Sequence, residues 1–306
     1  MTHSKSGEPL FRLDAVPSPD VMDILNRQMS VPEYAALERA FGAAVICKAG
    51  VYWRRVRPFF YRPLVPLQQL DPETTPRPAS WPRGCKFAVG DPASANSTMS
   101  FLVYDDPREY SIEKLGHNRR QKISRAAKSF RVRRIVEFDE LREHGHRAYL
   151  SFFRRTNYGY KSDRASRAGF DRWVDTLARF PKAIVLGAYR PDGLCAVSVS
   201  YWVEDTLWCA SLFSDSDAAN QGIGEVMLHE LRQIAARQPG IGRIVMRPYR
   251  GGNNHDQYYM IRGCKIVRFP ARLEIHPVIR FFVKRLLPKL YATMCGDDDN
   301  REAREK

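Results

Sequence analysis

The chain has 306 residues, of which 44% are hydrophobic and 11% aromatic. This composition can fill a sizeable core and excludes a wholly disordered chain. The sequence has no run of 18 or more apolar residues and no apolar segment near its start, so we expect neither a transmembrane helix nor a secretory signal. The six cysteines form no CxxC pair, which excludes the usual zinc-ribbon and disulfide patterns. We therefore expect a cytoplasmic protein without a metal.

The chain is strongly basic. Lys and Arg number 49 against 34 Asp and Glu, which gives a formal net charge of +15. A surplus of this size fits three kinds of partner: nucleic acid, an anionic membrane surface or anionic small molecules. The length corresponds to about two domains.

Residues 1–110 have the pattern of a small α+β lobe. Ser30 and Glu33 form a capping box with Pro32 at the helix start, which predicts a helix through Tyr34 and Leu37. The proline-bounded segment 57–63 is interpreted as a packed irregular connector, and four prolines between 71 and 84 predict a loop. Short β-branched and aromatic runs predict strands at 43–47, 51–56, 86–89 and 100–104.

Residues 111–130 are interpreted as a basic linker helix. Nine cations lie between 114 and 134, and only Glu113 opposes them. Like charges at this density repel one another unless something neutralises them. Two interpretations stay open: a solvated helix face, or an anion-binding helix that uses Arg119, Arg120 and Arg125.

Residues 131–276 predict a second domain with a mostly antiparallel sheet flanked by helices. Three consecutive strands joined by short turns form a meander, and a helix follows that Pro239 and Gly240 end. The predicted strands are 131–136, 183–189, 194–203, 206–213, 243–246, 264–269 and 272–275, and the predicted helices are 137–154, 169–180, 222–237 and 254–262.

The turn Gly222-Ile223-Gly224 is the most informative motif. It precedes a helix whose apolar stripe would be Ile223, Met227, Leu231 and Ile234. Glycines let backbone amides approach a ligand, and the free N–H groups and dipole at a helix start favour a phosphate. A plain loop is the alternative. The absence of GxGxxG and GKS/GKT motifs excludes Rossmann and P-loop sites.

A second motif, Asn253 to Lys265, reads as a short helix that ends at Gly263. Its Tyr259 is a candidate proton donor for a leaving thiolate. A core tyrosine satisfied by a hydrogen bond is the alternative.

Together these residues resemble the GNAT superfamily of acyl-CoA-dependent N-acyltransferases. The family's R/Q-x-x-G-x-G/A motif aligns with residues 219–224, and its Y-x-x-x-G-F motif aligns with 259–264, where Ala219 and Cys264 depart from the pattern. The resemblance implies that acetyl-CoA or another acyl-CoA is the co-substrate. It also implies that Tyr259 faces the sulfur and that the cofactor is bound by Phe213, Asn220, Gln221, Gly222, Ile223, Gly224 and Asn254.

The whole chain resembles the FemAB-like branch, in which a basic helix precedes the second of two GNAT-type lobes. The resemblance implies direct attack of an amine on the acyl carbonyl, with Glu225 as candidate base beside Asp215 and His255. His229 is interpreted as a surface histidine paired with Glu225. Two alternatives stay open: an aminoacyl transferase that uses aminoacyl-tRNA, as Fem members do, and a non-catalytic binding protein on a degenerate GNAT scaffold.

Residues 277–306 predict a basic amphipathic helix, interrupted at Pro288, and a charged tail. Arg280, Lys284, Arg285 and Lys289 flank its apolar stripe. Such a helix packs on the protein with its cations in water or lies on an anionic membrane. The first interpretation is favoured, and the second places the protein at the inner face of the membrane.

Overall fold

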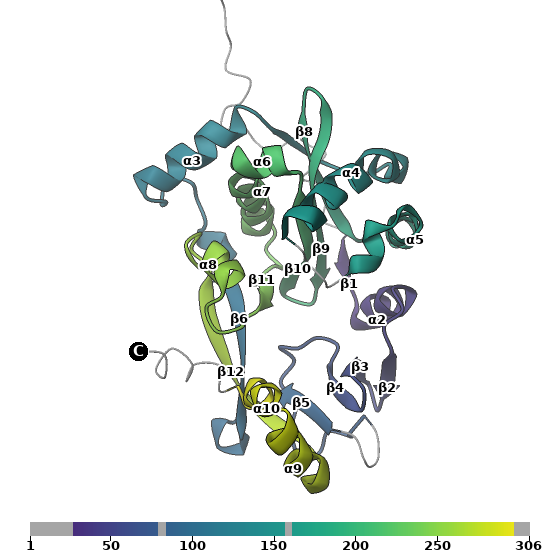
Figure 1. Ribbon diagram of the computed structural model, residues 1–306. Coiled ribbons are helices and arrows are strands. Elements are labelled where there is room, and N and C mark those ends of the chain that lie inside the picture. The colour runs from purple at the N-terminus through teal and green to yellow at the C-terminus, as the bar shows by residue number, and fades with distance from the viewer. Residues whose placement is uncertain (1–26, 79–83, 157–160, 297–306) are drawn as a thin grey trace, which may run out of the picture. The chain divides into compact units, whose positions relative to one another are not determined.

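The structure is a computed structural model that describes residues 27–78, 84–156 and 161–296 (Figure 1). The first 26 residues of the predicted N-terminal lobe and the charged tail from 297 lie outside the described residues. The chain divides into two compact units, each built from two stretches. Unit 1 comprises Met1–Gln28 and Asp106–Ile244, and unit 2 comprises Met29–Asp105 and Val245–Lys306.

The strands of unit 1 form an antiparallel meander in the order β10-β9-β8-β7. Their buried Val, Leu and Ala residues and the tight turn at Glu204 and Asp205 produce this pattern, as the sequence predicts. A β-bulge interrupts β10 between Cys209 and Ser211. The bounds are β7 (Arg131–Arg134), β8 (Ile184–Arg190), β9 (Gly193–Val203) and β10 (Thr206–Ser214).

Five α-helices of unit 1 are described. Helices α4 and α5 pack together and cover β9 and β10 through an aromatic cluster that includes Tyr149, Phe170 and Trp173. The predicted apolar stripe of α7 is buried, which confirms that prediction. The bounds are α3 (His117–Ala127), α4 (Phe138–Thr156), α5 (Arg167–Ala178), α6 (Ser216–Asn220) and α7 (Ile223–Arg237), with 3-10 turns η2 (Pro107–Glu109) and η3 (Ser162–Ala165).

The strands of unit 2 are mixed in direction and follow the order β2-β3-β4-β5-β12-β6-β11, in which the first two residues of β11, Arg243 and Ile244, belong to unit 1. The pair β4 and β5 is parallel, and the pairs β2-β3, β3-β4, β12-β5 and β12-β6 are antiparallel. Trp53 and Phe87, both fully buried, form its core. The bounds are β2 (Val45–Lys48), β3 (Val51–Arg57), β4 (Phe60–Pro63), β5 (Gly84–Ala88), β6 (Ser97–Asp105), β11 (Arg243–Pro248) and β12 (Lys265–Glu274).

The helices of unit 2 come from both ends of the chain. The predicted capping box of α2 is present, with Ser30 and Glu33 each bonded to the backbone of the other. Pro288 separates the two C-terminal helices, as predicted. The remaining elements are α2 (Val31–Ala40), α8 (Asn254–Met260), α9 (Pro277–Leu286), α10 (Pro288–Cys295), the 3-10 turn η1 (Pro92–Ser94) and the short strand β1 (Gln28–Met29), which straddles the boundary between the units.

Three local predictions were wrong. Segment 57–63 contains strand β4, because Phe60 and Tyr61 pair with β3 and β5 after a turn at Phe59, where φ is +61°. The two predicted closing strands are the single strand β12, which pairs with β6 up to Ala271 and with β5 from there. The segment between β10 and Gly222, where no helix was predicted, contains helix α6, which Asp215 caps by accepting a hydrogen bond from the Ala218 N–H.

The two units interleave along the chain, whereas the sequence predicted consecutive domains at 1–110, 131–276 and 277–306. The difference arises from β12, whose register with β5 and β6 packs the residues after 245 with those before 105. Such pairing between distant segments leaves no local mark in the sequence. The overall class is mixed α+β with mostly antiparallel strands, as predicted.

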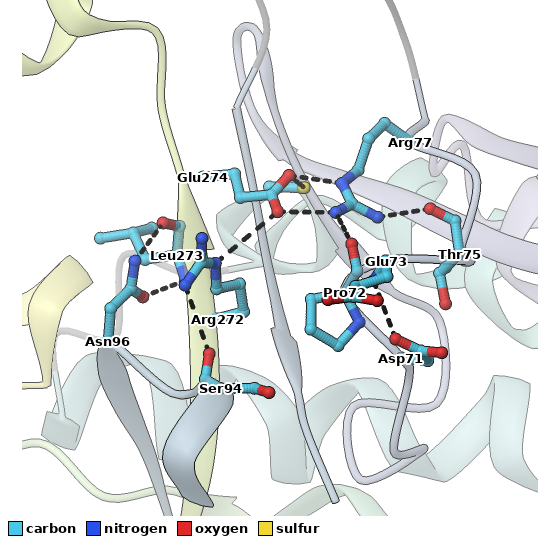
Figure 2. A network of polar contacts seen from close by, with 11 residues as sticks. Asp71, Pro72, Glu73, Thr75, Arg77, Ser94, Asn96, Arg272, Leu273 and Glu274 are labelled. Atoms are coloured by element: carbon cyan, nitrogen blue, oxygen red, sulfur yellow. Dashed lines mark hydrogen bonds and ion pairs between the residues drawn. The ribbon is translucent and has the colours of Figure 1, made fainter. Parts of the chain in front are cut away.

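The proline-rich loop of unit 2 is fastened to β12 by one arginine (Figure 2). The guanidinium of Arg77 donates to both carboxylate oxygens of Glu274, with Nη2 at 2.7 Å from Oε1, and to the carbonyls of Pro72 and Thr75. It also lies over the Phe87 ring, 5.2 Å from its centroid. The predicted loop is therefore ordered from Asp71 to Pro78 by a bidentate ion pair.

Candidate active site

The backbone at Gly222 has the left-handed conformation that glycine adopts without cost, with φ of +84°. Gly222 is the N-cap of α7, and its carbonyl accepts the Glu225 N–H at 2.9 Å. A side chain here would first meet the Cβ atom of Ala126 on α3, at 3.6 Å. The structure therefore requires glycine for its backbone conformation and sets α3 beside the turn.

Two backbone amides of the predicted cofactor-binding segment 220–224 already have acceptors. The Gln221 N–H donates to the Asp217 carbonyl at 3.0 Å, and the Gly222 N–H donates to the Ala219 carbonyl at 3.1 Å. These two amides therefore donate hydrogen bonds to carbonyls of helix α6, although the sequence motif had assigned them to a ligand. Asn220 is exposed at the end of α6, and Ile223 and Gly224 form the first turn of α7, where helix N–H groups lack intrahelical acceptors.

The structure brings two predicted site residues together. A guanidinium nitrogen of Arg119 on α3 lies 2.6 Å from a carboxylate oxygen of Glu225 on α7, and their side chains are 20% and 8% exposed. The candidate base is therefore engaged in a buried ion pair that joins the two helices. Arg120 and Arg125, the other two predicted anion-binding residues, are exposed, while Ile123 and Ala126 form the buried side of α3.

Phe213, predicted to lie along the cofactor arm, is a core residue. Its ring packs against Tyr149 at 5.2 Å and Trp173 at 6.0 Å. Beside it, at the bulge of β10, the Lys161 ammonium donates to the carbonyl of Ala210 at 2.8 Å. The predicted role concerns the backbone of this strand, which is paired at Phe213 with Val197 of β9.

Tyr259 and Asn254 lie on α8, in unit 2. Asn253 caps this helix by accepting the Asp256 N–H at 3.0 Å. Tyr259 is half-buried, and its ring meets that of Tyr258 edge to face at 5.0 Å. The other predicted site residues, Phe213, Asn220 to Gly224, Glu225 and the three arginines, all lie in unit 1.

The loop before α8 is built around a fully buried carboxylate that the sequence analysis did not identify. Asp256 accepts the backbone N–H groups of Arg250 at 3.0 Å and Gly252 at 3.2 Å, and Arg247 lies 3.6 Å from it. Asp256 therefore fixes the conformation of the segment that leads into the helix of Tyr259. His255, a candidate base, is exposed in the first turn.

A basic groove in unit 1 also escaped the sequence analysis. It has a volume of about 710 Å³ and lies among α4, α5 and the start of α6. Four of its residues are arginines against one acidic lining residue, Glu143, and Arg167 also pairs with Asp171 at 3.0 Å. The spacing of Arg147, Arg154 and Arg155, seven and eight residues along one helix, could have indicated a shared face. The lining residues are Glu143, His146, Arg147, Leu150, Ser151, Arg154, Arg155, Arg167 and Ser216.

Two residues of the groove, Arg155 and Ser151, form hydrogen bonds with the segment that precedes the Gly222 turn. Arg155 donates to the Ser216 hydroxyl at 3.1 Å and to the Ser214 carbonyl at 3.2 Å. The Ser216 N–H donates to the Ser151 hydroxyl at 3.0 Å. Burial lowers the pKa of Arg155, and the charge of Asp215 partly opposes this. Arg155 is thus held at the start of α6, and the other three arginines line the same groove.

His229 is buried, so its prediction as a surface partner of Glu225 was wrong. Its Nδ1 lies 2.6 Å from the Tyr110 hydroxyl and its Nε2 lies 3.0 Å from the Gln233 amide. Burial, reinforced by Arg232, lowers its pKa to about 4. A neutral imidazole is therefore part of the packing between α7 and the segment around η2.

No three His, Cys, Asp or Glu side chains in the described residues gather closely enough to hold a metal ion. Across 27–78, 84–156 and 161–296, no helix combines the length and apolar character needed to cross a bilayer.

The fold is similar to that of several solved structures, although no family model and no curated protein matches the sequence. FemX has a TM-score of 0.55 at 8% identity, covering 83% of this chain and 93% of that one. The C-terminal domain of a lysylphosphatidylglycerol synthetase from Agrobacterium fabrum has a TM-score of 0.50 at 12% identity, covering 82% and 90%. L-PGS from Bacillus licheniformis also has a TM-score of 0.50 at 12% identity, covering 89% and 97%. The predicted Fem-like layout is confirmed at the level of the fold.

Proposed function

We propose that this protein transfers an acyl group from a phosphate-bearing carrier to an amine, with acyl-CoA as the first candidate donor. The observation that carries the proposal is the arginine groove of unit 1, which is hydrogen-bonded to the segment leading into the Gly222 turn. Coenzyme A carries a pyrophosphate and a 3′-phosphate, and guanidinium groups bind phosphate in a bidentate manner.

In this proposal the chemistry is direct transfer. The amine attacks the acyl carbonyl, the carbon–nitrogen bond forms as the carbon–sulfur bond breaks, the amine proton passes to water, and a proton returns to the leaving thiolate. Tyr259 is the proposed proton donor. We assign Glu225 to holding α3 against α7, because Arg119 engages its carboxylate.

The test compares donor binding with two matched pairs of substitutions. Coenzyme A and acetyl-CoA at millimolar concentration should raise the melting temperature of the wild-type chain. The groove pair Arg147→Gln/Arg154→Gln should lose most of that shift, while the α3 pair Arg120→Gln/Arg125→Gln should retain it. A wild-type chain that shows neither a shift nor thiol release from acyl-CoA with any amine would contradict acyl-CoA use.

Aminoacyl-tRNA is the second candidate donor. The similarity to FemX and to lysylphosphatidylglycerol synthetases favours it, because Fem-like proteins are expected to use aminoacyl-tRNA and the name of the synthetase denotes a lysyl-bearing lipid product. Filter binding of aminoacyl-tRNA should then weaken steeply with salt. Substituting either arginine pair by Glu should reduce the salt dependence, whereas an unchanged affinity in both variants would exclude this donor.

A further inference from the structure

Helix α9 presents part of its apolar surface to solvent. Phe281 and Phe282 are in contact, with ring centroids 5.7 Å apart. Single exposed apolar residues are normal on a protein surface, whereas a contiguous cluster of large ones indicates an interaction surface. The exposed fractions lie between 52% and 68% for the five side chains Val278, Phe281, Phe282, Leu286 and Leu287.

The helix carries cations beside these apolar side chains. Arg280, Lys284 and Arg285 lie on α9, and residues 277–295 contain no Asp or Glu. At 100° per residue, Arg285 falls between Phe281 and Val278 on the exposed arc. A long cationic side chain in this position can extend past buried apolar neighbours to a headgroup phosphate.

The packing of α9 on α10 keeps this face exposed. Helix α9 packs on α10, and Ile279 and Val283 are half-buried. The C-terminal carbonyls of α10 are held by unit 2: Lys86 donates to the Met294 carbonyl at 2.7 Å and Ser97 to the Cys295 carbonyl at 2.8 Å. Figure 1 shows α9 next to α10. Because α10 is fixed to the sheet, it gives α9 a stable base.

We propose that α9 docks on the surface of an anionic phospholipid bilayer. Ten residues rise about 15 Å, half of the hydrocarbon thickness, so the helix lies in the interface. The apolar face would enter the acyl boundary while the cations meet lipid phosphates. A second copy of this chain fits less well, because two faces without acidic residues repel each other.

The test is co-sedimentation of the full chain with vesicles. Vesicles of phosphatidylcholine with phosphatidylglycerol should bind the chain, and pure phosphatidylcholine vesicles should bind it at least about tenfold more weakly. Phe281→Ser/Phe282→Ser should reduce binding by about tenfold or more, and Lys284→Ser/Arg285→Ser should weaken its salt dependence. Ile261→Ser, which alters an equally exposed apolar residue of unit 2 outside α9, should bind as the wild type does.

Circular dichroism verifies that each variant is folded, and sedimentation velocity without lipid reports self-association. Absent binding to the anionic vesicles would overturn the proposal, as would binding that the phenylalanine variant retains. If the wild type forms a dimer and the Phe281→Ser/Phe282→Ser variant is monomeric, the face binds a second copy of the chain instead. Because these readouts need no donor or acceptor, they are independent of the proposed transferase activity.

Discussion

Arg119 and Glu225, which are 106 residues apart in the sequence, form an ion pair at 2.6 Å that joins α3 to the first turn of α7. The pair lies one helical turn from Gly222, whose position is in turn set against Ala126 of α3. The basic helix α3 therefore packs beside the Gly222 turn through Arg119 and Ala126, and its other cations are exposed. We therefore expect substitutions of Arg119 and Arg120, which are adjacent in the sequence, to change the stability of the chain by different amounts.

Arg119→Met should destabilise the chain by about 3 kcal/mol, because it removes the guanidinium that pairs with the buried Glu225 carboxylate. Arg120→Met, one residue away and exposed, should change stability by less than about 0.5 kcal/mol. Urea unfolding of both variants measures the difference. Combining Arg119→Met with Glu225→Leu should recover much of the loss, and equal stability of the two single variants would contradict the structural role of the pair.

Gly222→Ala should destabilise the chain by about 1–2 kcal/mol, because alanine resists the left-handed conformation at φ of +84°. The nearest atom to the new Cβ, at 3.6 Å, is at ordinary contact distance, so the loss comes from the backbone. Gly222→Asn should lose less, since asparagine tolerates this conformation. Thermal unfolding that ranks asparagine no better than alanine would show that crowding against α3 dominates.

Features encoded locally were predictable from the sequence. The capping box at Ser30 and the apolar stripe that begins at Ile223 depend on residues three or four positions apart, and both are present. The meander of unit 1 follows from short turns between apolar runs. For these elements, neighbours along the chain determine the structure.

The missed features depend on distant partners. His229 is buried because Tyr110, 119 residues earlier, packs over it. Strand β12 pairs with β5 and β6 through residues that are 162 (Lys265 and Val103) to 189 (Glu274 and Cys85) positions apart. The arginine groove combines α4 with Arg167 of α5 and Ser216 of α6. Periodicity within one segment contains no information about such pairings.

His229 should make folding stability depend on pH. Its usual pKa of 6.5 is lowered to about 4 in the folded chain, chiefly by burial and then by Arg232. Between these values only the unfolded chain binds the proton, so this stability is full above pH 6.5 and is lost as the pH falls toward 4. The loss should reach about 3 kcal/mol at most. Urea unfolding between pH 7.5 and about pH 4.5 measures it.

The control is His229→Gln, which keeps a hydrogen-bond acceptor for Tyr110 and does not titrate. Glu230 acts with the opposite sign, because burial raises its pKa to about 7, so its contribution is present at low pH and is lost as the pH rises. The difference between the two chains isolates His229. Parallel stability curves for wild type and variant would show that His229 does not contribute.

Cysteine reactivity should separate Cys47 from two buried thiols. Cys47 is exposed on β2. Burial raises the pKa of Cys85 and of Cys195 to about 12, with added effects of Glu274 on the first and Asp215 on the second. Because the thiolate reacts, a maleimide near neutral pH should modify Cys47 first and reach the other two only after unfolding. Peptide mass spectrometry with a urea-unfolded control measures the order.

Glu274→Gln turns this reactivity into a test of the loop anchor in Figure 2. The change removes the charge that Arg77 pairs with and that lies 3.9 Å from the Cys85 sulfur. It should therefore loosen the loop from Asp71 to Pro78 and make the Cys85 thiolate easier to form. Cys85 should then react faster in the variant at alkaline pH, while Cys195, which donates to the Ala188 carbonyl in the other unit, keeps its wild-type rate. Faster labelling of both would indicate global destabilisation, and an unchanged rate at Cys85 would mean that the loop is held without Glu274.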